Sequence, residues 1–169
     1  NVNIRGLTII NPADSPNTDG LNPDSCRLVR ISDCYISVGD DCITIKSGSE
    51  YEHPDRYAPC RDIAITNCTL ERGHGGVVIG SEMSGGVKNV VISNCVFIGT
   101  DRGIRIKSRR GRGGIIEDIR VSNLIMDGVL CPFTMNLYYH IGVRGNTDVS
   151  DKTARSVDDT TPRLRRIHF

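Results

Sequence analysis

Four short polar motifs in this chain carry carboxylates, an imidazole and two cations, which are side chains suited to acid–base chemistry. They are Asn17-Thr18-Asp19-Gly20, Gly39-Asp40-Asp41-Cys42, Gly73-His74-Gly75-Gly76 and Arg105-Ile106-Lys107. If the carboxylates lie close together, we expect one of them to have a raised pKa and to hold a proton while others stay ionised. A protonated acid beside an ionised base is what glycosidic cleavage requires. The two cations suit an anionic substrate, because Arg can bind a carboxylate in a bidentate manner.

The motifs fall at corresponding positions of a sequence repeat. Five stretches align so that one column holds Leu7, Cys34, Cys68, Cys95 and Leu124, with steps of 27, 34, 27 and 29 residues. A repeat of this length indicates a stacked array of structural units. In this register Asp19 aligns with Asp41, and Asp40 aligns with His74, each pair one unit apart.

Each unit consists of short alternating runs of β-branched residues bounded by Gly, Asp and Asn, which indicates strands. No stretch has helical periodicity over three turns. Strands that recur about every 27 residues predict an all-β fold, a right-handed parallel β-helix with one unit per coil. Two interior rows are expected, one of Ile43, Val77 and Ile104 and one of Ile45, Ile79 and Ile106. Since neighbouring coils lie ~4.8 Å apart, the carboxylates and His74 should share a patch about 10 Å across.

A further column contains Asp33, Asn67, Asn94 and Asn123. A structural role is expected for it, because Asn and Asp tolerate left-handed turns and stacked amides can hydrogen-bond along a ladder.

The seven cysteines show no spacing typical of a zinc site, so we expect no metal. Cys34, Cys68 and Cys95 share the inward Leu/Cys column and should act as small buried hydrophobes. Cys42 lies beside the Asp pair, but it aligns with glycines and has no His near it in sequence. A nucleophilic role for Cys42 is therefore not expected.

Composition narrows the class of protein. The net charge of +1 argues against nucleic acid as the main partner, and no apolar run reaches the ~18 residues of a membrane helix. No signal peptide is present. The chain starts and stops inside strand-like repeats without capping units, so we expect residues 1–169 to be one β-helix domain truncated at both ends. Polar tracts near residues 49–59 and 142–162 are expected to be loop insertions on one face, with a new coil starting at Arg163.

Each motif alone has an ordinary structural explanation. An Asp-Gly pair is usually a turn, an Asp-Asp pair is usually solvated, and Arg105 and Lys107 could form a solvated strand face. The convergence of all four motifs on one corner of successive coils favours a functional site.

The four motifs, in this order and at these spacings, resemble the signatures of glycoside hydrolase family 28, the polygalacturonases and their relatives. The resemblance covers roughly residues 1–140. It implies a right-handed parallel β-helix that hydrolyses α-1,4 links between galacturonic acid units with inversion at the anomeric carbon. It also implies that a pectin or polygalacturonate oligosaccharide is the partner, that no cofactor is needed, and that the full-length protein is secreted or periplasmic. The resemblance leaves the oligomeric state and endo or exo action open.

The resemblance also implies residue roles. Asp40 would be the general acid, Asp19 and Asp41 would hold and deprotonate the attacking water, and His74 would tune the acid. The residues implied in substrate binding are Arg105, Lys107, Asn17 and Tyr138, with Tyr139 as the alternative to Tyr138.

Three rival functions remain open at this stage. A non-catalytic β-helix that binds polysaccharide, such as a tailspike or adhesin stalk, would keep the repeat without needing Asp19, Asp40, Asp41 and His74 together. A pectate lyase would need calcium and a basic Arg or Lys. A rhamnogalacturonan hydrolase would tend to lack the Gly-His-Gly and Arg-Ile-Lys motifs.

Overall fold

The computed structural model describes residues 1–50, 53, 57–139 and 153–169, and within these residues all regular elements are strands. In chain order they are β1 (Val2–Arg5), β2 (Thr8–Ile10), β3 (Arg27–Ser32), β4 (Tyr35–Val38), β5 (Asp41–Ile45), β6 (Cys60–Thr66), β7 (Thr69–Arg72), β8 (Gly75–Ile79), β9 (Val87–Ile98), β10 (Arg102–Lys107), β11 (Ile115–Asp127), β12 (Cys131–Asn136) and β13 (Arg163–His168). Among the described residues, none forms a helix long and apolar enough to cross a membrane.

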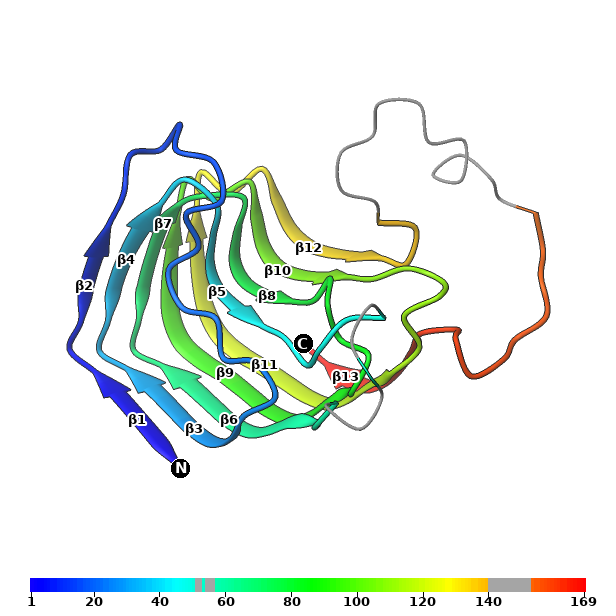
Figure 1. Ribbon diagram of the computed structural model, residues 1–169. Coiled ribbons are helices and arrows are strands. Elements are labelled where there is room, and N and C mark those ends of the chain that lie inside the picture. Colours follow the sequence, from blue (N-terminus) through cyan, green and yellow to red (C-terminus); the bar gives the residue numbers. More distant parts are fainter. Residues whose placement is uncertain (51–52, 54–56, 140–152) are drawn as a thin grey trace.

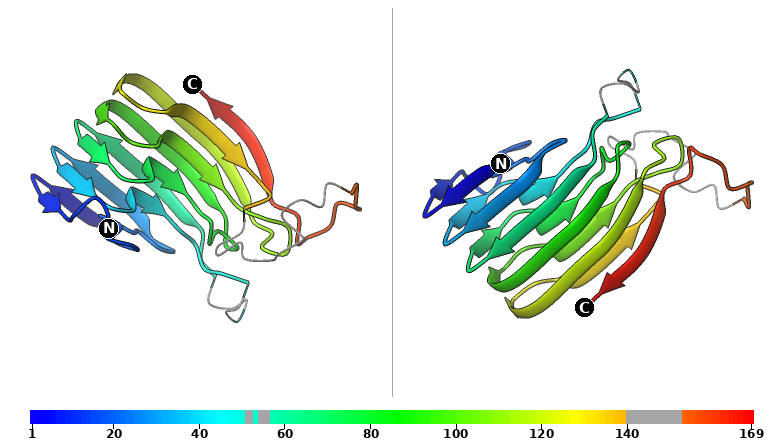
Figure 2. Two further views of the ribbon diagram at one scale, coloured as in Figure 1. Left: turned by 90° about the horizontal axis from the view of Figure 1, so that it is seen from above. Right: turned by 90° about the horizontal axis from the view of Figure 1, so that it is seen from below.

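The strands form two parallel sheets that wind into a stack of coils (Figures 1 and 2). One sheet has four strands in the order β12-β10-β8-β5, and the other has nine and turns a corner within each coil. A typical coil is formed by the three short strands β3, β4 and β5. The fold is therefore the right-handed parallel β-helix that the repeat predicts.

The pairing register follows the aligned repeats. The first strands of successive coils pair through Val2, Val29, Ile63, Val90 and Ile119, which reproduces the predicted steps between coils. β13 continues the stack by pairing with β11, so that Ile167 lies beside Ile119, and the predicted coil start at Arg163 is confirmed. Of the two predicted loop insertions, residues 51–52, 54–56 and 140–152 lie outside the described part of the chain.

Period-2 alternation fills the interior of the coils. Ile45, Ile79 and Ile106 pair in one row and have exposed fractions of 0–1%, which confirms the predicted interior row. The row of Ile43, Val77 and Ile104 is equally confirmed. Phe97 is the largest fully buried side chain among the described residues, and it packs in the same core.

The cysteines are mostly part of this core. Cys34, Cys68 and Cys95 are buried in one column, as predicted. Leu7 of the same column is 45% exposed, because it lies on the outermost coil and has a neighbouring coil on one side. Burial raises the pKa of Cys42 to about 12, so its thiol is protonated at neutral pH and does not act as a nucleophile.

The Asp/Asn column marks the corner of the larger sheet. Asp33, Asn67, Asn94 and Asn123 all have positive φ angles between 54° and 57°. In β9 and β11 this left-handed residue lies inside one long strand and bends it. Amide contacts run along part of the column, with the Nδ2 of Asn123 donating to the Oδ1 of Asn94 at 2.6 Å. The structural role predicted for the column is confirmed.

Candidate active site

The four polar motifs meet on the outer face of the four-stranded sheet. They line a cavity of about 390 Å3 together with residues from the neighbouring turns. The lining residues are Asn17, Asp19, Asn22, Asp40, Asp41, Lys46, His74, Ser81, Glu82, Arg105, Lys107 and Tyr139. Seven of the eight residues named from the sequence as site residues are in this set, and the exception is Tyr138.

Coil stacking brings the residues of this site together. Asp40 and Asp41 lie where β4 turns into β5, and His74 holds the same corner one coil later, because Asp41 pairs with Gly75. The segment that carries Asp19 runs beside β5, and Leu21 pairs with Ile43 there. Asp19 is therefore in register with Asp41, as the sequence predicts.

Asp40 and His74 form a contact that is open to solvent. The Nδ1 of His74 lies 3.2 Å from the Oδ1 of Asp40, and the two side chains are 54% and 20% exposed. The backbone N–H of Asp41 donates to the same Asp40 oxygen at 2.9 Å. The Asp40 carboxyl is thus fixed in position while its edge remains accessible from the cavity.

Asp41 is in a different environment, because its side chain is only 2% exposed. The Nζ of Lys107 donates to its Oδ2 at 2.7 Å, and the Nη1 of Arg105 donates to its Oδ1 at 3.3 Å. Burial raises the pKa of Asp41 above its ordinary value, although Lys107 and Arg105 oppose this shift. The sequence predicts one raised carboxyl pKa, and in the structure it belongs to Asp41, whereas the resemblance gives the acid role to Asp40.

Asp19 contacts the third cation of the site. Its Oδ2 lies 3.7 Å from the Nζ of Lys46 and accepts a hydrogen bond from the Thr44 hydroxyl at 3.4 Å. Lys46 also lies 3.7 Å from the Oε2 of Glu82. Burial favours a raised pKa for Glu82, but its backbone N–H and the cations Lys46 and Arg112 hold the pKa below its ordinary value.

The two glycines beside His74 are required by close packing. Gly73 has a φ of +71°, and a Cβ at this position would lie 2.2 Å from the carbonyl oxygen of Asp40. A Cβ on Gly75 would lie 2.4 Å from the Cγ2 of Val78 and 3.0 Å from the Oδ1 of Asp41. The coil that carries His74 can approach the two aspartates because these positions lack side chains.

Tyr139, and not Tyr138, is the tyrosine of the site. Its ring centroid lies 5.0 Å from the Nζ of Lys107 and 5.4 Å from the Cζ of Arg105, which is within cation–π range. Tyr138 is 54% exposed and lines a different cavity. The placement of Tyr138 at this site is therefore wrong, because the two adjacent residues project in different directions.

The site includes residues that the sequence did not single out. Glu82 and Ser81 lie in the turn after β8, and Asn22 lies beside Thr44 in the segment that pairs with β5. Lys46 could have been identified from the sequence, since it occupies the same strand position as Lys107 two coils later. Within the described residues, no group of three or more His, Cys, Asp or Glu side chains is arranged to hold a metal ion.

Comparison with known proteins places the chain in a family. The family model for glycosyl hydrolases family 28 matches residues 1–162. A probable polygalacturonase of Vitis vinifera is 44% identical over 141 residues, which are 82% of this chain and 28% of that protein. The chain spans roughly a third of the length of the curated relatives that it matches, between 28 and 38%.

Solved structures agree with this placement. A polygalacturonase from Erwinia carotovora ssp. carotovora superimposes with a TM-score of 0.74 at 33% identity, over 81% of this chain and 35% of that one. An exopolygalacturonase from Thermotoga maritima gives a TM-score of 0.70 at 34% identity, over 81% of this chain and 31% of that one.

Proposed function

The chain belongs to glycosyl hydrolase family 28, and we propose that the protein containing it hydrolyses α-1,4 galacturonosidic bonds of polygalacturonan with inversion. The observation that carries this proposal is the stacking of Asp19, Asp40, Asp41 and His74 around one cavity beside two cations. The names of the relatives, polygalacturonases from plants and bacteria, support the same substrate class.

Asp40 acts as the general acid in this proposal. Its carboxyl is accessible from the cavity and contacts His74, which can reload it or orient its proton. Asp19 and Asp41 hold the attacking water and take its proton. An inverting pair needs carboxyls ~6.5–9.5 Å apart, and Asp40 and Asp19 lie on neighbouring coils, ~4.8 Å apart along the stack, at different positions of the corner.

Lys107 and Arg105 have two roles in this proposal, one toward Asp41 and one toward the substrate. Lys107 and Arg105 neutralise Asp41, so that a polyanionic substrate can approach a site that contains four carboxylates. Their outer N–H groups, together with Asn17 and the face of Tyr139, bind the galacturonate unit at the cleavage point. Because pectin lies outside the cell membrane, the full-length protein acts there, as a secreted or periplasmic enzyme.

The test is a comparison of Asp40→Asn with Asp127→Asn in the full-length protein, on homogalacturonan. Asp127 is an exposed aspartate at the end of β11 in the other sheet, so this change removes the same charge far from the cavity. We expect Asp40→Asn to lower reducing-end release ~10²–10⁴-fold, the usual contribution of a general acid, with Asp127→Asn unchanged. A folded Asp40→Asn variant that keeps most of its activity would show that the acid is elsewhere.

The product separates the rival functions. Hydrolysis gives saturated ends and continues in the presence of a calcium chelator. An unsaturated product, formed only with calcium, would indicate a lyase, and binding of pectin without any product would indicate a polysaccharide-binding β-helix. Anomeric analysis of the first product tests inversion directly.

A further inference from the structure

The outer face of the larger sheet carries an excess of positive charge. This basic face is formed by β3, β6, β9, β11 and β13, which lie side by side on the side of the stack away from β5, β8 and β10 (Figures 1 and 2). It is therefore separate from the cavity that contains the aspartates, which lies on the four-stranded sheet.

Three columns of side chains cross the basic face, and the pairing register of the strands sets their order. The residues of the second column all have a positive φ, between 54° and 60°, which lets two successive residues of each strand face outward. The first column is Arg27, Arg61, Lys88, Glu117 and Arg165, the second is Leu28, Asp62, Asn89, Asp118 and Arg166, and the third is Arg30, Ala64, Val91, Arg120 and His168.

The charge of this face differs from that of the whole chain. Its three columns contain seven lysine or arginine side chains and three carboxylates, which leaves an excess of four positive charges. The whole chain has a net charge of only +1. Positive charge is therefore concentrated on one face of the molecule.

All three carboxylates of the face are already engaged by cations of the same face. Their ion pairs, with N···O distances of 2.5–2.7 Å, are Arg61 with Asp62, Arg165 with Glu117, and Arg166 with Asp118. Four cations of the face form no ion pair with a carboxylate among the described residues. They are Arg27, Arg30, Lys88 and Arg120.

The fold does not require cations at these positions. Ala64 and Val91 occupy the third column between Arg30 and Arg120, so neutral side chains are accepted there. In the first column, three cations follow one another on successive coils ~4.8 Å apart, an arrangement that their mutual repulsion makes unfavourable. A bound polyanion would remove this repulsion.

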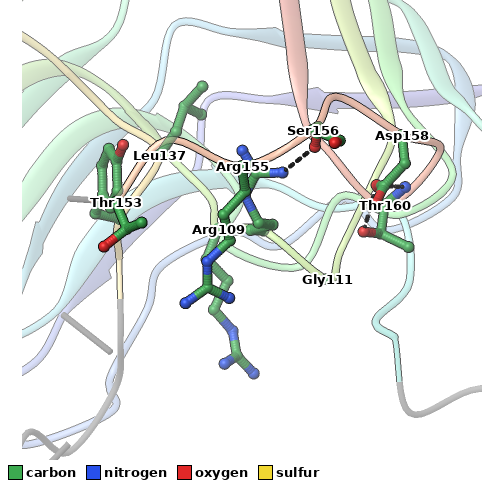
Figure 3. Close-up of a pocket in the computed structure, with 10 residues that line it drawn as sticks. Arg109, Gly111, Leu137, Thr153, Arg155, Ser156, Asp158 and Thr160 are labelled. Carbon is green, nitrogen blue, oxygen red and sulfur yellow. Dashed lines mark hydrogen bonds between the residues drawn. The ribbon is translucent and has the colours of Figure 1, made fainter. Parts of the chain in front are cut away.

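The far edge of the basic face is fixed by contacts of β13. The segment that leads into β13 lines the cavity drawn in Figure 3, and its Thr160 carbonyl oxygen accepts hydrogen bonds from the N–H groups of Gly111 and Gly113 at 3.0 and 2.9 Å. The Nη1 of Arg120 donates to the carbonyl oxygen of Arg166 at 2.7 Å. β13 is thus held against β11, and the three columns continue across five strands.

The chemistry of the face suits a linear polymer of carboxylates. Three of its four unpaired cations are arginines, whose planar guanidinium groups can bind a carboxylate through two N–H donors. The three columns contain no Phe, Tyr or Trp, so they offer no stacking surface for nucleic-acid bases. Within the columns, the large exposed apolar side chains are Leu28 and Val91, too few for a surface that enters a membrane.

We propose that the basic face binds a second stretch of de-esterified galacturonan, away from the stretch that is cleaved at the aspartates. The inference rests on the proposed function, which supplies the identity of the polyanion, because galacturonan carries a carboxylate on each sugar. Single exposed ion pairs contribute little, so this binding arises from several carboxylates of one chain acting together. Its effect is to keep the enzyme on the polymer after the cleaved stretch has left the cavity.

The test measures binding of long polygalacturonate to the full-length protein while a short oligogalacturonate fills the cavity with the aspartates. Asp40→Asn is present in every protein compared, so that no polymer is cleaved during the measurement. Two double variants, Arg30→Gln/Arg120→Gln and Arg27→Gln/Lys88→Gln, each remove two unpaired cations. Arg30→Lys/Arg120→Lys is the matched control that keeps the charge. Thermal melts show whether each variant folds, and either Gln pair decides the question if the other does not fold.

At low salt we expect the Kd of long polygalacturonate to rise about tenfold in each Gln pair and to stay near the parent value in the Lys pair. Binding should weaken as the salt concentration rises, because these charges are largely exposed. Heavily methyl-esterified pectin, which lacks most of the carboxylate charge, should bind weakly to all the proteins. An unchanged Kd in both Gln pairs, or binding of the long polymer that the short oligogalacturonate abolishes completely, would overturn the inference.

Activity measurements separate this inference from the proposed function. With Asp40 restored, Arg30→Gln/Arg120→Gln should cleave the short oligogalacturonate with the wild-type kcat/KM; a tenfold loss on this substrate would overturn a binding face remote from the cavity. If the wild type releases no reducing ends, the proposed function fails. The binding measurement still decides about the basic face in that case, because it needs no turnover.

Heparin and duplex DNA are the comparison polyanions. If the basic face recognises galacturonan, both should bind more weakly than polygalacturonate at the same salt concentration. Binding of either that is as tight, and that is lost in the Gln pairs, would show a general polyanion surface and would overturn the assignment to galacturonan.

Discussion

Replacing Lys107 by Met should destabilise the folded protein most strongly at neutral pH. The Nζ of Lys107 is 2.7 Å from the Oδ2 of Asp41, and the two side chains are 10% and 2% exposed. Met keeps the length and the apolar stem of Lys but leaves that carboxylate oxygen without its charged donor. A water molecule in the place of the ammonium group would restore a hydrogen bond but not the positive charge.

The size of the effect follows from the remaining contacts. Breaking a buried ion pair by removing one partner typically costs ~3–5 kcal/mol, because an uncompensated charge stays in the interior. Arg105 still reaches the Oδ1 of Asp41 at 3.3 Å and compensates part of the charge. We therefore expect a loss of about 3 kcal/mol at pH 7, at the lower end of that range.

The loss should depend on pH in a definite direction. The pKa of Asp41 is raised in the folded state, so the folded protein holds this proton more tightly than the unfolded chain does. That contribution to stability is complete below the unfolded value of 3.8 and disappears as pH rises through the folded pKa. Lys107→Met removes a cation that opposes the shift and so raises the pKa further. The difference in stability between wild type and variant should be small near pH 4 and grow toward pH 7.

Urea denaturation at both pH values measures this difference. Lys88→Met is the control, because Lys88 lies on β9 in the other sheet. The double variant Asp41→Asn/Lys107→Met should recover much of the stability, since it removes the buried charge together with its partner. An equal loss at both pH values, or a loss at pH 7 no larger than that of Lys88→Met, would refute the reasoning.

Three further outcomes are expected. In an activity assay, Lys107→Ala should lower kcat as well as raise KM, because Lys107 contacts Asp41, to which we assign a part in activating the water. A change in KM alone would indicate that Lys107 only binds the substrate. Gly73→Ala should abolish measurable turnover, since its Cβ would lie 2.2 Å from the Asp40 carbonyl oxygen; wild-type kcat would contradict this packing. In a denaturation experiment, Asn94→Ala should lower the free energy of unfolding by about 1–2 kcal/mol, because the φ of 56° is strained for Ala. Asn94→Gly should lower it less. Equal losses in the two variants would show that the lost amide hydrogen bonds, and not the backbone strain, cause the effect.

The coil register was predictable from the sequence for a physical reason. In a parallel stack each residue must lie beside its counterpart in the next coil, so a column of Cys, Leu or Asn in the alignment is a column in space. This constraint holds across steps of 27 and 34 residues, since β3 pairs in register with β6 and β6 with β9. The same constraint places Asp19 beside Asp41 and Asp40 beside His74, so the sequence alone predicts both neighbours correctly.

The side chains that the sequence misplaced or missed lie where the register ends. Tyr138 and Tyr139 follow β12, and the described residues contain no later strand that pairs with β12 and extends the column, so alternation could not decide which of the two faces the cations. Glu82 lies in the turn after β8, outside the aligned columns. The sequence also could not tell which aspartate is buried, because that depends on Lys107 and Arg105 reaching two coils back to Asp41.

The same long-range pairing explains how a carboxylate-rich corner can be stable and could accept the polyanion that we propose as the substrate. Three of the acids on this side of the sheet are paired with a lysine from another segment of the stack: Asp41 with Lys107, and Asp19 and Glu82 with Lys46. Glu82 in turn contacts Arg112, which lies 2.9 Å from Glu50, and Glu50 pairs with Arg109. Charges therefore alternate in sign along this side of the stack. Asp40 is not part of this chain of ion pairs. Among the described cationic side chains, it pairs only with His74. Among the three aspartates, Asp40 is therefore the one without a lysine or arginine partner among the described residues, and this supports the general-acid role that we propose for it.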